Sequence, residues 1–120
     1  MTHLRLADLY DRGLQDLDGL SPFEKDVFVI HDLDLYYEME SGFEDYFLSG
    51  GHESQLSWLS GTLLRIGDAQ SLAVVTALRR VGDDDRASMG PLCDSFFRLR
   101  EERWTLLLDH LRSGDVVVDE

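Results

Sequence analysis

The sequence predicts an all-α fold, a single-domain bundle of about five or six helices. A chain of 120 residues is the length of one domain, and its 43% hydrophobic content is enough for a core. Apolar residues recur at helical spacing in several segments, and glycines separate these segments. Since no repeat or long linker divides the chain, residues 1–120 are expected to form one domain, with 115–120 as a tail that is either flexible or ordered.

Two long helices are predicted in the first third of the chain. Residues 3–17 carry leucines near helical spacing, and Thr2 is placed to cap this segment. The second helix has a stronger start signal, because Ser21 is followed by a proline and then, at the third position, by Glu24. This pattern is typical of a capping box. The helix is expected to run to about Glu40 and, being apolar on more than one side, to lie at the centre of the bundle.

A short aromatic helix is predicted after Gly42. Phe43, Tyr46 and Phe47 have i, i+3 and i+4 spacing, so a helix places all three rings on one face. Glycines then mark the limits of the remaining helices, which are expected at about residues 52–66, 69–81 and 91–112. In the last of these, Arg98 and Glu102 are spaced for an ion pair.

The charge of the chain is strongly negative. It has 24 acidic and 11 basic residues, for a net charge of −13. Residues 1–60 hold 13 acids and 3 bases, a net of −10, whereas residues 61–120 hold 11 acids and 8 bases, a net of −3. Such a charge argues against binding to nucleic acids or anionic membranes and favours a basic partner.

Ten carboxylates are the candidates for a partner-binding acidic surface. The alternative is that acidic residues serve solubility alone. The candidates are seven residues of the first half and the three of an outlying turn: Asp26, Asp32, Glu38, Glu40, Glu44, Asp45, Glu53, Asp83, Asp84 and Asp85.

Catalytic and metal-binding interpretations have weaker support. Cys93, the only cysteine, lies near the start of an amphipathic helix beside Asp94, an acid that raises a thiol pKa instead of activating it. His31, Asp34 and Glu38 lie along one side of a helix, but a single such set is more typical of a local hydrogen-bonded network than of a metal site. We therefore expect no enzyme activity, no cofactor and no metal.

Two further segments resemble ligand loops only superficially. The Asp83–Asp85 turn lacks the alternating spacing and distal glutamate of an EF-hand. The Gly50-Gly51 pair could form an anion nest, but no lysine or arginine occurs between residues 26 and 64 to favour a phosphate there. We interpret both segments as turns.

The region from Tyr36 to Leu78 resembles the bacterial DNA-mimic protein family, small acidic helical proteins largely filed as a domain of unknown function. The resemblance lies in Glu40-Ser41-Gly42-Phe43, in Asp45 before the aromatic pair Tyr46-Phe47, in Ser49, and in the step Ile66-Gly67-Asp68. It covers about a third of the chain, with acids or serine where the family has amides. It implies an all-α fold that occupies the DNA-binding surface of a transcription regulator or nucleoid protein.

Together these observations predict an acidic protein-interaction module, with a DNA mimic as the leading hypothesis. The alternative is an immunity or antitoxin-like protein that blocks a basic nuclease toxin, since both functions require the same electrostatics. The single cysteine, the early acids and the lack of an apolar run of about 20 residues predict a cytoplasmic protein. Whether it is a monomer or a homodimer is left open.

Overall fold

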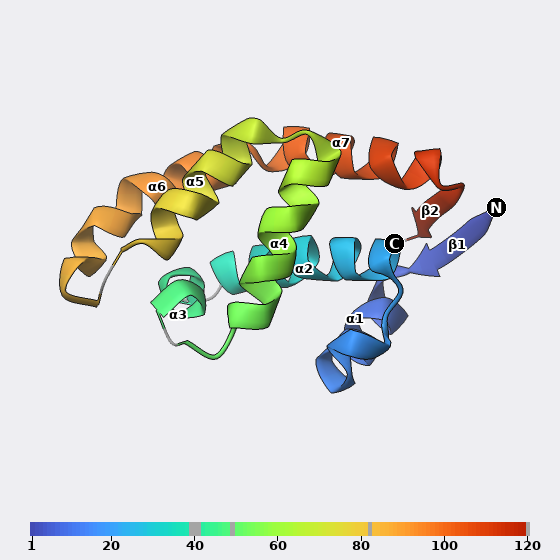
Figure 1. Cartoon of the computed structure of the whole chain (residues 1–120), viewed down its shortest axis with the longest axis horizontal. Coiled ribbons are helices and arrows are strands. Elements are labelled where there is room, and N and C mark those ends of the chain that lie inside the picture. The colour runs from blue at the N-terminus through green and yellow to red at the C-terminus, as the bar shows by residue number, and fades with distance from the viewer. Residues whose placement is uncertain (39–41, 49, 82, 120) are drawn as a thin grey trace.

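The protein is an elongated assembly of seven α-helices and one small sheet in the part of the chain that its computed structural model describes (Figure 1). That part comprises residues 1–38, 42–48, 50–81 and 83–119, apart from the side chains of Asp83 and Asp84. In chain order the elements are β1 (Thr2–Arg5), α1 (Leu6–Gln15), the 3-10 helix η1 (Leu17–Gly19), α2 (Pro22–Tyr37), α3 (Gly42–Leu48), α4 (Glu53–Ile66), α5 (Ala69–Arg79), the 3-10 helix η2 (Asp83–Ser88), α6 (Met89–Arg98), α7 (Arg100–Ser113) and β2 (Val116–Asp119).

Helix α2 is the centre of the core, as its sequence predicts. It contacts α1, α3, α4 and α7, and every residue from Asp26 to Ile30 is buried. Its start is the predicted capping box: Glu24 N donates to Ser21 Oγ at 3.3 Å, and Ser21 N donates to Glu24 Oε1 at 2.9 Å. Neighbouring elements therefore cover this helix on several sides.

The short helix α3 closes one end of the core. Phe43 and Tyr46 are buried, and Phe47 packs against Phe43 with ring centroids 5.3 Å apart. This confirms the prediction from their spacing. Gly67, whose φ is +79°, then ends α4, and Asp68 caps α5 by accepting a hydrogen bond from the Ser71 amide at 3.0 Å. The predicted break between these two helices is also confirmed.

The last predicted helix is divided into α6 and α7 at Leu99, so the expectation of one helix over 91–112 is wrong. The division coincides with a buried arginine. Arg103 donates to the Phe96 carbonyl at 3.0 Å, and its guanidinium lies 3.8 Å from the centre of the Phe96 ring. Its side chain therefore binds the last turn of α6. Arg98 donates to Ser95 instead of to the expected Glu102.

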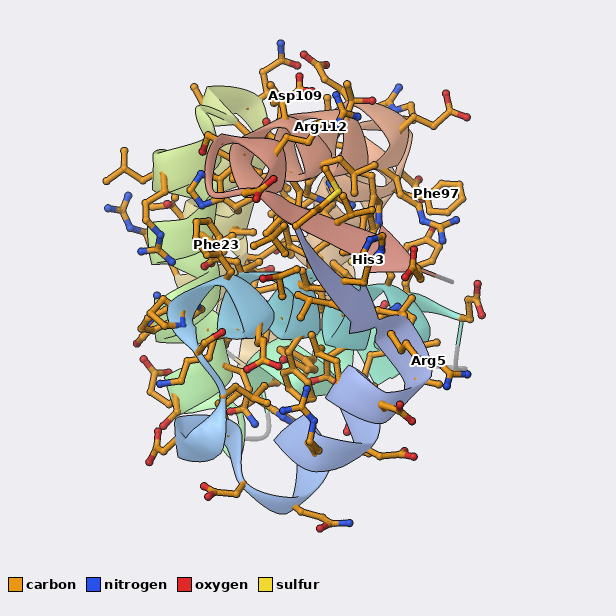
Figure 2. The ribbon with its side chains drawn as sticks, turned by 90° about the vertical axis from the view of Figure 1, so that its right-hand side faces the viewer. His3, Arg5, Phe23, Phe97, Asp109 and Arg112 are labelled. Carbon is orange, nitrogen blue, oxygen red and sulfur yellow. The ribbon has the colours of Figure 1, made fainter. Side chains whose placement is uncertain are left out.

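The two ends of the chain form a parallel two-stranded sheet, which the sequence did not predict. Thr2 pairs with Val116 and Arg5 with Asp119. The expectations of a first helix from residue 3 and of a capping Thr2 are therefore wrong, and of the two possibilities left open for the tail the ordered one holds for residues 116–119. The paired segments are 114 residues apart in sequence, so no local pattern reports their contact. Figure 2 views this end of the molecule, with His3 and Arg5 on the nearer side of β1.

The helix count is thus seven in the described part of the chain, not five or six, although the fold is mostly helical as predicted. None of the helices there is long and apolar enough to cross a membrane.

Candidate functional site

The structure removes two of the ten predicted carboxylates from the surface. Asp26 is 2% exposed, and its Oδ1 accepts hydrogen bonds from Trp58 Nε1 at 2.9 Å, Thr62 Oγ1 at 2.7 Å and Arg65 Nη2 at 2.5 Å. Its Oδ2 lies 3.2 Å from His110 Nε2. The partners come from α4 and α7, so Asp26 joins these helices to α2. The expectation that it belongs to an acidic surface is wrong.

Asp32 is the second buried carboxylate. It is 3% exposed, and it accepts hydrogen bonds from Tyr10 Oη at 2.8 Å and from Tyr46 Oη at 3.0 Å. Burial, followed by the nearby Asp32, raises the pKa of both tyrosines. Asp32 therefore holds α1 and α3 against α2, and its predicted place on the surface is also wrong.

Two further candidates are exposed but neutralised by arginines of the second half of the chain. Asp45 is bonded to Arg86, and Glu53 accepts from Arg79 Nη2 at 2.5 Å. These pairs fix α3 to the η2 turn and α4 to α5. The uneven charge of the two halves in sequence is therefore partly evened out in space.

Of the remaining six candidates, the structure describes the side chains of three. Glu38 and Asp85 are exposed, and Glu44 is half-buried. The predictions for the other three fall outside the described residues or side chains, namely Glu40, Asp83 and Asp84.

An acidic end of the molecule emerges where α2 terminates and α3 and α6 pack together. We define it as Glu44 of α3, Asp94 of α6 and Glu38, which directly follows Tyr37, a residue that packs on Phe43 of α3 and Phe97 of α6. Burial raises the pKa of the Cys93 thiol to about 11, with further contributions from Glu44 and then Asp94, so both carboxylates lie near this thiol. No described lysine or arginine side chain forms an ion pair with any of the three acids. Negative charge is thus concentrated here without a described ion pair, and Arg98, which lines the same pocket as Asp94, donates to Ser95.

Asp94 is the residue of this group that the sequence did not single out as part of an acidic surface. It lies in the less acidic half of the chain, and only the packing of α6 against α3 brings it near Glu44. An exposed acid on an amphipathic helix carries no signal of such a tertiary neighbour. The sequence did predict that Cys93 beside it is buried and has a raised pKa, and both features are present.

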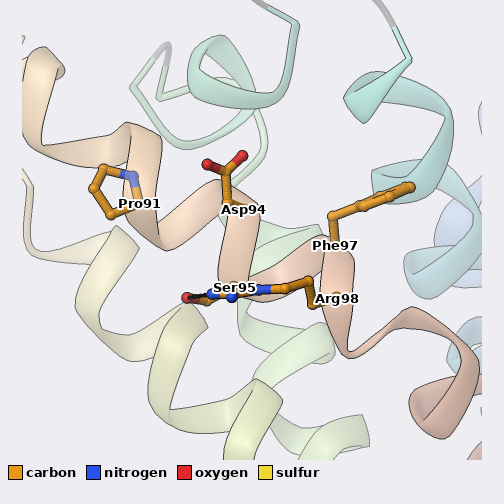
Figure 3. Close-up of a pocket in the computed structure, with 5 residues that line it drawn as sticks. All are labelled: Pro91, Asp94, Ser95, Phe97 and Arg98. Atoms are coloured by element: carbon orange, nitrogen blue, oxygen red, sulfur yellow. Dashed lines mark hydrogen bonds between the residues drawn. The ribbon is translucent and has the colours of Figure 1, made fainter.

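An open pocket adjoins the acidic end on α6 (Figure 3). Its volume is about 520 Å³, and Pro91, Asp94, Ser95, Phe97 and Arg98 line it. Phe97 is 45% exposed and stacks on Tyr37, with ring centroids 4.6 Å apart and planes at 9°. Asp94 contributes to a raised pKa of Tyr37, after burial, so the carboxylate also faces this stacked pair. An acid and an exposed aromatic ring thus share one pocket.

Asp34, one of the three residues considered for metal binding, belongs to a network of hydrogen bonds and ion pairs. Asp34 Oδ2 accepts from Trp104 Nε1 at 2.7 Å and from Arg100 Nε at 3.4 Å, and Arg103 Nη2 lies 3.5 Å from its Oδ1. Asp34 is nearly buried, as expected, but these donors come from α7. Within the described residues, no three His, Cys, Asp or Glu side chains are grouped so as to hold a metal ion.

Comparison of the chain with protein-family models, with curated proteins and with solved structures gives no match. The resemblance to the DNA-mimic family therefore stays a prediction from the residues that carry it.

Proposed function

We propose that the protein is a binding protein that presents the carboxylates of its acidic end to the DNA-binding surface of a basic protein, in the manner of a DNA mimic. The observation that carries the proposal is the concentration of Glu38, Glu44 and Asp94, without described ion pairs, on a protein of net charge −13. Duplex DNA presents a dense row of negative charges, and proteins that bind it do so largely through lysine and arginine. A fixed group of carboxylates competes for the same side chains.

The contrast with four of the other predicted carboxylates supports this assignment. Asp26 and Asp32 accept hydrogen bonds in the core. Asp45 and Glu53 form ion pairs with arginines. Folding therefore uses these four carboxylates internally. The acids of the acidic end have no such use in the described structure and remain open to a partner.

Binding to a basic nucleoid protein, measured at low and high salt with duplex DNA as competitor, tests the proposal. We expect binding that weakens steeply as salt rises, since charge interactions at a surface are screened, and that DNA displaces. Binding that neither salt nor DNA affects would contradict it.

A matched pair of triple variants separates the acidic end from net charge. Glu38→Gln, Glu44→Gln and Asp94→Asn together remove three charges from the acidic end and should weaken binding at least tenfold, as about 1.4 kcal/mol in total implies. Asp8→Asn, Asp11→Asn and Asp18→Asn remove three exposed charges near α1, at the other end of the molecule (Figure 1), and should have a much smaller effect. Equal losses in the two variants would mean that overall charge, not this site, governs binding.

A further inference from the structure

Phe97 of α6 has an exposed aromatic ring. Tyr37 covers one face of this ring by parallel stacking, and 45% of the residue is still exposed, so the exposure falls on its outer side. Figure 2 shows Phe97 projecting at the edge of the molecule. A ring held in this way keeps its orientation, because its stacking partner Tyr37 also packs edge-on against the buried ring of Phe43. It presents a fixed aromatic surface to solvent.

One carboxylate and one guanidinium, those of Asp94 and Arg98, line the pocket together with this ring. Asp94 precedes Phe97 by three residues on α6, which places both on one side of the helix. Glu44 of α3, which packs against α6, lies near Cys93, the residue before Asp94. Arg98, the cation of the pocket, donates to Ser95 Oγ at 3.2 Å, and together with Ser95 it also lines a second hollow with Gln70 and Val74 of α5. The open ring therefore adjoins carboxylates.

We propose that Phe97 and Asp94 receive an arginine side chain of the basic partner. The guanidinium stacks on the outer face of Phe97 and donates hydrogen bonds to the Asp94 carboxylate, while Glu44 adds to the negative field. Arginine is favoured over lysine because its planar group both stacks on a ring and matches a carboxylate with two parallel donors, whereas an ammonium is a strongly hydrated point charge. The proposal rests on the proposed function and names the partner group that its site selects.

Titration with two short peptides tests this inference, one of alternating arginine and glycine and one with lysine in place of arginine. The peptides have equal length and charge, so attraction to the acidic surface alone binds them equally. We expect the arginine peptide to bind about fivefold more tightly, which corresponds to one cation–π contact. Amide chemical-shift changes should centre on Phe97 and Asp94. Equal affinity for the two peptides would overturn the proposal.

Substitutions at Phe97 provide the matched controls. Phe97→Leu keeps an apolar side chain but removes the ring, and it should abolish the preference for arginine; Phe97→Tyr should retain it. Leu64→Ala, which removes another exposed apolar side chain on α4, should leave both affinities unchanged. A Phe97→Leu variant that still prefers arginine would overturn the role of the ring.

The peptide titration and the DNA competition together distinguish the arginine contact from DNA mimicry. If both peptides bind equally, salt weakens both, and Asp94→Asn weakens both alike, the acidic end still attracts basic partners while the arginine-selective contact is wrong. If DNA fails to compete for the nucleoid protein but the arginine preference and its loss in Phe97→Leu are observed, the contact is supported and DNA mimicry is contradicted.

Discussion

At the scale of single residues, Asp26 and Asp94 show how differently the same side chain is used. Asp26 accepts three hydrogen bonds at one oxygen and faces His110 at the other, inside the core. Asp94 lines a surface pocket without an ion pair among the described residues. A buried carboxylate is tolerated only when donors surround it. The number of donors that the fold supplies therefore decides which acids are available to a partner.

Removal of the Asp26 carboxylate should destabilise the protein strongly. We expect Asp26→Ala to lower the free energy of unfolding by about 3–5 kcal/mol, because it leaves the buried donors and the Arg65 charge without their partner. Urea denaturation measures this. The control is Asp109→Ala, which removes an exposed acid of α7 and should change stability by less than about 0.5 kcal/mol. A similarly small loss for Asp26→Ala would contradict its structural role.

At the scale of elements, the start of α2 is decided by local sequence and then reinforced by a neighbour. The capping box of Ser21 and Glu24 forms within four consecutive residues, and Arg12 of α1 adds an ion pair with Glu24 at 2.5 Å. Partial burial pushes the pKa of Glu24 upward, but the hydrogen bond from the Ser21 amide and then the Arg12 guanidinium outweigh it. The pKa of this carboxyl is therefore lower than usual.

This depressed pKa predicts an acid-sensitive contribution to stability. The ionised Glu24 stabilises the fold fully above the pKa of an unfolded glutamate, about 4.3, and the contribution is lost as pH falls through the lower folded value. We expect Glu24→Gln to cost about 1 kcal/mol at pH 7 and progressively less in acid. Urea denaturation at several pH values measures the difference from the wild type.

A suitable control for this series is Gln15→Ala, an exposed change with no titratable group, which should track the wild type at every pH. A Glu24→Gln difference that stays constant into strong acid would mean that the carboxylate charge is not what stabilises the cap.

The break between α6 and α7 shows the limit of local reasoning about elements. The segment around Leu99 contains good helix formers and no glycine or proline, so periodicity predicts a continuous helix. The observed division accompanies Arg103, which is 1% exposed and binds both Phe96 and Ser71 of α5. Burial lowers the pKa of Arg103, and the Asp34 carboxylate opposes this shift. Such a contact depends on three other helices, and the sequence near Leu99 contains no sign of it.

At the scale of the whole molecule, the sheet joins the two ends of the chain beside α1 and α7. Leu4 and Val116 are buried, whereas His3 and Arg5 are exposed, which is the alternation of a strand with one covered face. A two-stranded sheet is marginal by itself. Packing of its inner face against the helices therefore stabilises it.

Adjacent valines of β2 test this arrangement. Val116→Ala should lower the free energy of unfolding by roughly 2 kcal/mol, because it removes buried methyl groups from the inner face. Val117→Ala, on the opposite and more exposed face, should cost less than half as much. Thermal or urea denaturation compares the two. Equal costs would contradict the register in which Val116 pairs with Thr2.

Much of the fold could be predicted from local pattern. The capping box of α2, the aromatic face of α3, the glycine end of α4 and the central position of α2 all follow from spacing within one helix. Periodicity alone did not predict that this central position also buries two acids of α2. A helix covered on several sides has little solvent-facing surface, so Asp26 and Asp32 are buried although both were expected on the surface.

The sequence by itself thus determined the helical class, the main helix starts and stops, and the large negative charge, because these depend on neighbouring residues or on composition. Only the tertiary structure decided which carboxylates are neutralised and which remain open. Arg79 and Arg86 reach acids of the first half, and α6 brings Asp94 beside Glu44. The strand pairing of the two chain ends was decided in the same way. These contacts join residues far apart in the chain, and their energy depends on distances that only folding sets.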